Sequence, residues 1–179
     1  VAGEPSGDLH GSKLIKAIKH LNPNSSFMGH GGDSMRNEGM HIIEHVDSLA
    51  IMGFAEVLRH LPRMNKIMRN TVGAIERSKP DRVILIDYPG FNLRLAKRLS
   101  PLKIPITYFI LPQAWAWKQR RVEVLKRFTD QSISIFPFEN DWYKKHGLRV
   151  DYFGHPFVDI EHFNETTKSF YKRHSLNLC

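Results

Sequence analysis

Short runs of aliphatic residues alternate along the chain with longer segments in which apolar residues recur every three to four positions. The clearest run, VILI at residues 83–86, follows a Lys-Pro-Asp turn and precedes Asp-Tyr-Pro-Gly. Continuous apolar character over four residues is typical of a strand that is buried on both faces of a parallel sheet. Further strands are predicted at residues 26–32, 104–111, 132–136 and 150–154, and residues 1–3 have the character of a strand end.

Helical segments are predicted between these strands, at residues 11–21, 55–76, 93–100, 119–128 and 138–146. Strands that alternate with helices of this length predict an α/β fold built on a Rossmann-like, doubly wound parallel sheet. Ligands of such sheets bind at the carboxyl ends of the strands. The chemistry is therefore expected in the turns that follow the strands.

Composition narrows the class of partner. The chain of 179 residues carries a formal net charge of +8, which favours an anionic partner such as nucleic acid, an acidic membrane surface or a phosphorylated substrate, with simple solubility as the alternative. Its single cysteine, Cys179, excludes a disulfide framework and a cysteine-based metal site, and the ten histidines show no metal-ligand spacing. No metal or cofactor is expected. The sequence shows neither an apolar run long enough to cross a membrane nor a signal peptide.

The first candidate turn, AGEPSGDLHGS, spans residues 2–12. Its glycines would let a ligand approach the backbone closely, and Ser6 or Asp8 could cap the following helix. Glu4 and Asp8 would compete with a bound phosphate, and the pattern is neither G-x-G-x-x-G nor a P-loop. A capped strand–helix turn and a functional loop both remain open.

The second candidate turn follows the aliphatic run 83–86 and contains Asp87, Pro89, Gly90 and Asn92. A carboxylate at the mouth of an apolar strand is partly desolvated, which raises its pKa and strengthens it as a general base. The Asn92 amide could bind a hydroxyl or a phosphate. Alternatively, Asp87 caps the next helix and Asn92 only supports the turn.

Two further turns carry aromatic and basic side chains. In PQAWAWKQRR, two tryptophans that suit sugar faces or acyl chains precede arginines that suit phosphate; a hydrophobic plug before a basic helix is the alternative. In FGHPFVD, His155 ends a strand and could meet a ligand, although a structural role is the commoner one.

Residues 51–70 combine an apolar stripe with a basic flank, and Pro62 divides the stripe. The pattern fits docking on an anionic membrane surface, and equally a core helix with a solvated basic face. Nucleic acid is not expected, because the interleaved residues are aliphatic where stacking would need aromatic ones. The residues assigned to docking are Ile51, Met52, Phe54, Val57, Leu58, Leu61, Arg63, Met64, Lys66, Ile67 and Met68.

Seven motifs, taken together and in order, resemble the lipid-A-disaccharide synthase family: VAGEPSGDLHGSKLI, GGDSMRNEG, IMGFAEVL, DYPGFN, PQAWAWKQRR, FPFE and FGHPFVD. The resemblance runs from residue 1 to about residue 159. It implies an inverting, metal-independent glycosyltransferase of the glycosyltransferase-B fold, of which this chain would form the N-terminal half. The implied reaction joins UDP-2,3-diacylglucosamine to 2,3-diacylglucosamine 1-phosphate (lipid X), giving the lipid A disaccharide 1-phosphate and UDP.

The resemblance also implies residue roles and a location. Asp87 matches the proposed general base, and further motif positions match the cleft or the acceptor side: Glu4, Ser6, Gly7, Asp8, Asn92, Gln113, Trp115, Trp117, Arg120 and, at the last strand, His155. The stripe at residues 51–68 matches a bilayer-docking region, which implies a cytoplasmic protein peripheral to the inner membrane of Gram-negative bacteria. A homodimer of the longer protein is a further expectation.

The resemblance predicts a Rossmann-like acceptor domain at residues 1–160, with its first strand truncated, and the start of a linker to a second domain at residues 161–179. No segment matches the UDP-binding half, so the chain alone is expected to be inactive. The alternatives are a non-catalytic membrane- or lipid-binding module and another glycosyltransferase-B enzyme that acts on a lipid-linked sugar.

Overall fold

The computed structural model describes residues 1–50 and 61–158. The helices are α1 (Pro5–Leu21), α2 (Asp33–Asn37), α3 (Val46–Ala50), α4 (Leu61–Ser78), α5 (Pro89–Leu99), the 3-10 turn η1 (Ser100–Leu102), α6 (Arg121–Phe128) and α7 (Pro137–Lys145). The strands are β1 (Met28–Gly31), β2 (His41–His45), β3 (Val83–Ile86), β4 (Ile106–Phe109), β5 (Gln131–Ser134) and β6 (Asp151–Tyr152).

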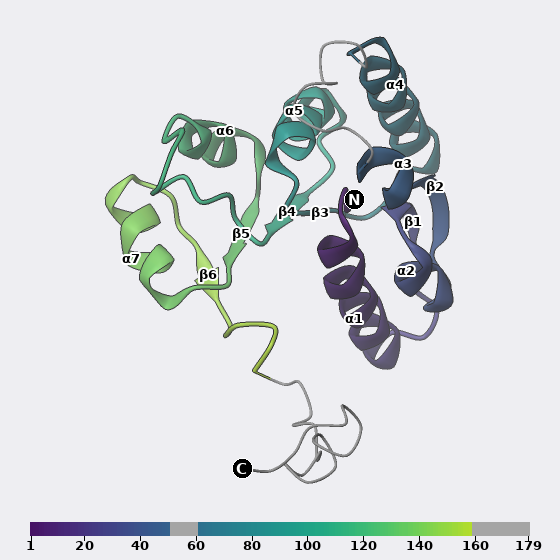
Figure 1. The fold of residues 1–179 in the computed structure, drawn as a ribbon, viewed down its shortest axis with the longest axis horizontal. Helices are drawn as coiled ribbons and strands as arrows, with labels where there is room; N and C mark the ends of the chain where they lie inside the picture. The colour runs from purple at the N-terminus through teal and green to yellow at the C-terminus, as the bar shows by residue number, and fades with distance from the viewer. Residues whose placement is uncertain (51–60, 159–179) are drawn as a thin grey trace, which may run out of the picture.

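All paired strands are parallel. Two sets, β1-β2 and β3-β4-β5-β6, are joined by residues 1–2, which lie between β1 and β3 (Figure 1). Ala2 N donates to His30 O at 3.0 Å, Val1 N donates to Ile84 O at 2.6 Å, and Ile86 N donates to Val1 O at 2.9 Å. These bonds form a parallel ladder, so the predicted strand character of the first residues is confirmed. The resulting order is β2-β1-residues 1–2-β3-β4-β5-β6.

This order creates a topological switch point between residues 1–2 and β3. From residues 1–2 the chain proceeds to β1 and β2 on one side, and then returns to β3 and proceeds to β4, β5 and β6 on the other. Loops that leave the two central strands therefore diverge to opposite faces and open a crevice at their carboxyl ends. Gly3–Glu4 and Asp87–Tyr88 flank that crevice.

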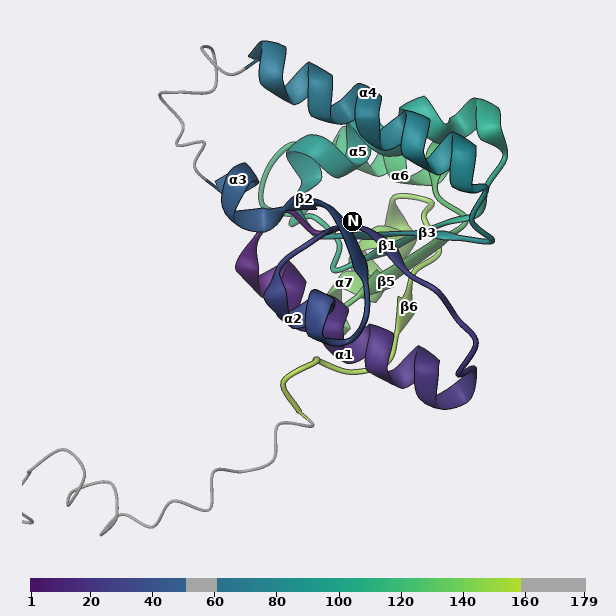
Figure 2. The ribbon, with the colours of Figure 1, turned by 90° about the vertical axis from the view of Figure 1, so that its right-hand side faces the viewer.

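The sheet is covered on both faces, with α4, α5 and α6 on one side and α1 and α2 on the other (Figure 2). Strand β3 shows why: Val83 and Leu85 pack into the cluster with α5 and α6, whereas Ile84 and Ile86 belong to the cluster with α1 and α2. Alternate residues of one continuous apolar strand thus serve two cores. The predicted Rossmann-like, doubly wound α/β fold is confirmed; the domain boundary at residue 160 stays a prediction.

Candidate active site

Asp87 lies in a strained elbow between β3 and α5. Asp87 and Tyr88 both adopt left-handed backbone angles, with φ of 44° and 47°, and α5 begins at the next residue, Pro89. Residues with a Cβ rarely adopt this conformation, which costs about 1–3 kcal/mol for each of them. The surrounding contacts must therefore stabilise this backbone conformation, which sets the direction of the Asp87 side chain.

Three hydrogen bonds hold the elbow. The Asp87 carbonyl oxygen accepts from the Tyr108 hydroxyl at 2.7 Å and from Asn92 Nδ2 at 2.8 Å, while Asp87 N donates to Phe109 O at 2.9 Å. Asn92 Nδ2 also lies 3.2 Å from Ile86 O and 3.3 Å from Val1 O. The elbow is thus tied to both central strands and to β4.

Asn92 is fully buried, at 0% exposure. Its assignment to substrate binding stays a prediction, and in this structure the core encloses the side chain. The alternative, support of the turn, is the role that the structure shows. The other alternative, in which Asp87 caps α5, does not hold: the N-cap residue is Tyr88, and no side chain caps the helix.

The Asp87 carboxyl group has a raised pKa. Burial is the main cause, and the negative charge of Glu4 across the switch point adds to it. A hydrogen bond from the Tyr88 N–H and the positive charge of Arg121 act in the opposite direction without cancelling the rise. A desolvated carboxylate with a raised pKa is a stronger proton acceptor than an ordinary surface aspartate.

The segment facing the elbow is shorter than the predicted turn, because α1 begins at Pro5. Proline is favoured at the first helical position, where its fixed φ suits the helix and its missing N–H costs nothing. Ser6, Gly7 and Asp8 therefore lie inside α1, and the prediction that Ser6 or Asp8 caps this helix is wrong. A Cβ on Gly3 would overlap the Tyr88 ring, so only glycine lets the two loops pack this closely.

Asp8 is buried, and its carboxylate binds backbone N–H groups at the start of α2. Its Oδ1 accepts from Gly32 N at 2.7 Å and Met35 N at 3.0 Å, and its Oδ2 accepts from Ser34 N at 3.0 Å. Burial disfavours the charged form, but these hydrogen bonds outweigh it and hold the pKa of Asp8 below its usual value. Asp8 thus holds the start of α2, and its assignment to substrate binding stays a prediction.

Of the four residues assigned in this motif, two remain accessible. Glu4 and Ser6 are exposed beside the crevice, whereas Gly7 is buried against Ala2 and Ile86. Gly7 therefore serves packing, and its predicted ligand contact stays a prediction.

Replacing Asp8 by asparagine should destabilise the fold by roughly 2 kcal/mol at pH 7, because the amide turns a donor toward the N–H of Ser34 and removes the charge. The pKa of Asp8 is depressed on folding, so its stabilisation is present above the unfolded pKa of about 3.9 and is lost as the pH falls through the folded pKa. Urea unfolding at pH 7 and pH 3 measures this. Equal differences between wild type and Asp8→Asn at both pH values would contradict the assignment.

The loop after β4 presents four of the predicted residues to solvent: Gln113, Trp115, Trp117 and Arg120. Lys118 and Arg121 place their cations 4.3 and 4.7 Å from the ring centre of Trp117. Trp115 donates its indole N–H to Glu139 Oε1 at 3.0 Å. The loop is therefore an exposed aromatic and cationic surface, and within it Pro112 and Ala114 are buried.

His155 follows the last strand and is half-buried. Its Nδ1 accepts from Phe157 N at 3.2 Å, and its ring packs on Phe136 at 5.6 Å between centroids. Its predicted ligand contact stays a prediction. Sequence reasoning did not identify Tyr108 or Glu139, which act on Asp87 and Trp115 from distant parts of the chain, and it assigned Arg121 to phosphate and not to Asp87.

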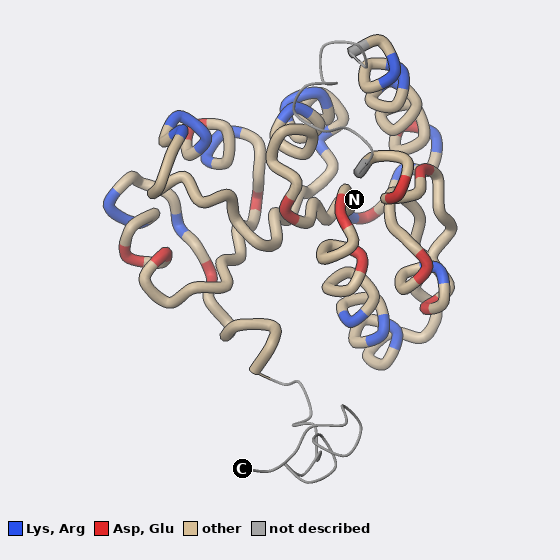
Figure 3. The backbone as a smooth tube through the Cα atoms, in the orientation of Figure 1, with Lys and Arg blue, Asp and Glu red and all other residues tan. Residues whose placement is uncertain are grey.

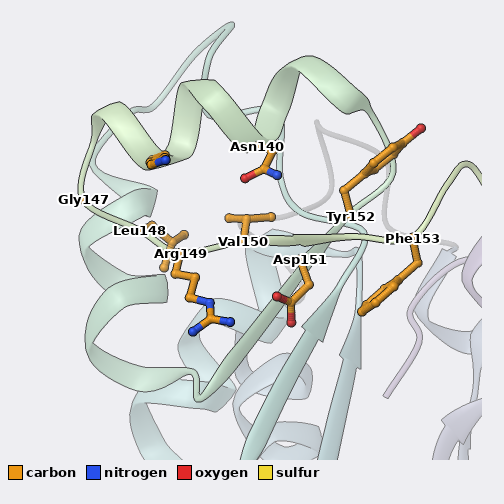
Figure 4. A pocket seen from close by; sticks show the side chains of 9 residues that line it. Asn140, Gly147, Leu148, Arg149, Val150, Asp151, Tyr152 and Phe153 are labelled. Atoms are coloured by element: carbon orange, nitrogen blue, oxygen red, sulfur yellow. The ribbon is translucent and has the colours of Figure 1, made fainter.

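Two hollows lie away from Asp87. One groove of about 660 Å³ runs between the end of α7 and β6 (Figure 4). Another, of about 360 Å³, lies at the amino ends of the strands, beside Arg82, Asp130 and Arg149. Neither is lined by residues of the switch point. Within residues 1–50 and 61–158, no cluster of three or more His, Cys, Asp or Glu could hold a metal ion.

The described part of the predicted docking segment lies in α4. Arg63 and Lys66 are exposed, and Lys and Arg gather along α4, α5 and α6 (Figure 3). Ile67 and Met68 are buried at 6% and 4% exposure, and Met64 packs against the same core. The sheet-facing side of α4 thus uses Ile67 and Met68 in the core, and their docking assignment stays a prediction. Ile51, Met52, Phe54, Val57 and Leu58 lie outside the described residues.

No helix within the described ranges is long and apolar enough to cross a membrane.

Comparison with known proteins gives a consistent result. A family model described as lipid-A-disaccharide synthetase matches residues 1–177. Three proteins named lipid-A-disaccharide synthase are similar: one from Myxococcus xanthus is 38% identical over 177 residues (99% of this chain, 46% of the relative), one from Alkalilimnicola ehrlichii 42% over 159 residues (89% and 42%), and one from Acidobacterium capsulatum 41% over 177 residues (98% and 44%). The chain spans less than half the length of each relative.

Proposed function

The chain belongs to the lipid-A-disaccharide synthase family, and from this premise we propose that the full-length protein is an inverting glycosyltransferase of lipid A biosynthesis. In the proposed reaction, 2,3-diacylglucosamine passes from its UDP donor to the 6-hydroxyl of lipid X. The observation that carries the proposal in this chain is Asp87, a carboxylate with a raised pKa in a fixed elbow at the switch point.

Asp87 acts as the general base in this scheme. The oxygen of the acceptor 6-hydroxyl attacks the anomeric carbon of the donor from the face opposite UDP. The bond between that carbon and the UDP oxygen breaks, UDP leaves with the electron pair, and the hydroxyl proton passes to Asp87. A single displacement of this kind inverts the anomeric configuration and needs one base and no covalent carboxylate. Glu4 strengthens the base by raising the pKa of Asp87.

The proposal is tested by incubating the full-length protein with UDP-2,3-diacylglucosamine and lipid X. Disaccharide and UDP should appear in equal amounts, with a β linkage in the product. UDP release that does not depend on lipid X would contradict the proposal. A purely lipid-binding module would give neither product.

We also propose that the protein docks on the anionic cytoplasmic face of the inner membrane through the exposed cations of α4. Each cation near an anionic surface contributes about 1 kcal/mol. Neutralising Arg63 and Lys66 together, as Arg63→Gln and Lys66→Gln, should therefore weaken binding to phosphatidylglycerol vesicles about 30-fold.

Co-sedimentation with vesicles measures this effect. The matched control is the pair Lys13→Gln and Lys16→Gln, two exposed lysines of α1 on the other side of the sheet. Equal weakening by both pairs would show that net charge alone drives binding, and would contradict docking through α4.

A further inference from the structure

A row of aromatic rings crosses the edge of the sheet at the carboxyl ends of β4, β5 and β6. Its members come from four separate segments and form an unbroken series of ring contacts. We call this set the aromatic row: Trp115, Phe138, Phe136, His155, Phe157 and His10.

Neighbouring rings are evenly spaced. Trp115 meets Phe138 edge-on with centroids 5.2 Å apart, and Phe138 stacks on Phe136 at 5.7 Å. From Phe136 the row continues through His155 to Phe157, whose centroids are 5.1 Å apart, and ends against His10 at 5.3 Å. The spacing lies within the range of favourable aromatic pairs. The row is therefore a packed surface and not a set of isolated side chains.

Much of the row faces solvent. Phe138 and Phe157 are 49% and 50% exposed, and Trp115 is 36% exposed. Contiguous exposed aromatic surface of this kind marks a ligand or partner site on a soluble protein. The row carries no Lys, Arg, Asp or Glu of its own.

A buried carboxylate fixes one end of the row. Glu139 is only 1% exposed; its Oε1 accepts the indole N–H of Trp115, and its Oε2 has no hydrogen-bond partner among the described residues. Burial raises the pKa of Glu139. Removing a carboxyl group from water costs free energy. The hydrogen bond that Glu139 accepts from the indole N–H sets the orientation of the Trp115 ring.

The row is continuous with the switch point at both ends. His10 packs edge-on against Phe109, and the carbonyl oxygen of Phe109 accepts from Asp87 N. At the other end, the loop that carries Trp115 leads into α6, and the positive charge of Arg121, the first residue of α6, lowers the pKa of Asp87. The row and Asp87 therefore lie at the same carboxyl edge of the sheet.

We propose that the aromatic row binds an acyl chain of the acylated amino-sugar substrate, with Glu139 as the positioning residue for Trp115. The inference rests on the proposed function, which supplies a substrate with acyl chains. A flexible hydrocarbon chain can follow an extended series of rings, whereas a sugar ring stacks on one or two. An apolar strip beside a polar reaction centre matches the two halves of such a substrate.

Binding to the full-length protein tests the proposal. Lipid X, kept below its critical micelle concentration, is compared with its deacylated counterpart, glucosamine 1-phosphate, by calorimetry. Phe138→Ala should weaken lipid X binding about tenfold and leave glucosamine 1-phosphate binding unchanged, since the loss is apolar contact area. The matched control is Phe153→Ala, the same substitution at an aromatic residue that is 77% exposed outside the row.

The role of Glu139 has its own readout. Glu139→Leu and Trp115→Phe should both weaken lipid X binding, because each removes the hydrogen bond between the two side chains. Glu139→Gln should bind lipid X like the wild type, because its amide oxygen still accepts the indole N–H. Lipid X brominated on its acyl chains should quench wild-type tryptophan fluorescence, and Trp115→Phe should remove that component of the quenching. Folding of each variant is checked by thermal unfolding.

Four outcomes would overturn the proposal. Equal losses for both ligands in Phe138→Ala would assign the row to the sugar, and equal effects of Phe138→Ala and Phe153→Ala would remove any special role. Loss of self-association in Phe138→Ala, with unchanged lipid X binding, would assign the row to a contact between two copies. If Asp87→Asn abolishes turnover while the row variants bind lipid X normally, this inference fails and the proposed function stands.

Discussion

An Asp87→Asn substitution in the full-length protein should lower the rate of disaccharide formation about 10²–10⁴-fold, the range expected for loss of a general base. The amide matches the carboxylate in shape but cannot accept the hydroxyl proton. The substitution should not destabilise the fold. Because the pKa of Asp87 is raised on folding, its ionised form costs stability at neutral pH, so a neutral side chain should leave the melting temperature unchanged or slightly higher.

Asp8→Asn is the matched control, because it makes the same chemical change at a buried aspartate of the neighbouring helix α1. Its expected signature is the reverse, with lower stability and near-normal turnover in the folded protein. Near-normal turnover in Asp87→Asn would contradict the assignment of the base. Loss of activity together with loss of stability in that variant would also contradict it.

Asn92→Leu should destabilise the protein by about 3 kcal/mol, because the carbonyl oxygens of Val1, Ile86 and Asp87 all lose the same buried amide donor. For a protein of this size, that loss lowers Tm by roughly 6–12 °C. Leucine keeps the side-chain volume, so the effect reports hydrogen bonds and not a cavity. Thermal unfolding followed by circular dichroism measures it.

The same substitution should also reduce turnover in the protein that remains folded, because the left-handed elbow loses one of its two side-chain donors. Tyr108→Phe removes the other donor while keeping the ring, and should cost less stability because a single hydrogen bond is lost. If Asn92→Leu melts like the wild type, the amide does not hold the elbow.

The strands were predictable where burial imposes a continuous apolar run. The aliphatic residues of β3 predicted a two-sided strand, and the structure confirms it with two cores. Strand β2 was not predicted, because HIIEH contains only two apolar residues and lies near the end of the sheet. The start of α1 was placed at residue 11 instead of Pro5, since two glycines in the first turns suggested a loop. Those glycines serve close packing, against Ala2 at Gly7 and against Met35 at Gly11.

The position of Asp87 was predictable because a polar residue directly after a buried strand must lie at the sheet edge. Its environment was not. Tyr108 and Arg121 come from segments 21 and 34 positions away, and only the strand order brings them to the elbow. Asp8 and Asn92 were assigned to substrate because polar residues in a motif suggest ligand contact. Burial decides between ligand contact and support, and sequence spacing alone does not reveal it.

The pH dependence of kcat/KM in the full-length protein tests the role of Asp87 most directly. The wild type should lose activity at low pH with a midpoint above the ordinary aspartate pKa of about 3.9, because the protonated carboxyl cannot act as a base. Glu4→Gln should move that midpoint to lower pH, since it removes a negative charge that raises the pKa of Asp87. The residual activity of Asp87→Asn should lack this acidic limb altogether. An acidic limb that persists in Asp87→Asn at the wild-type midpoint would show that another group is the base.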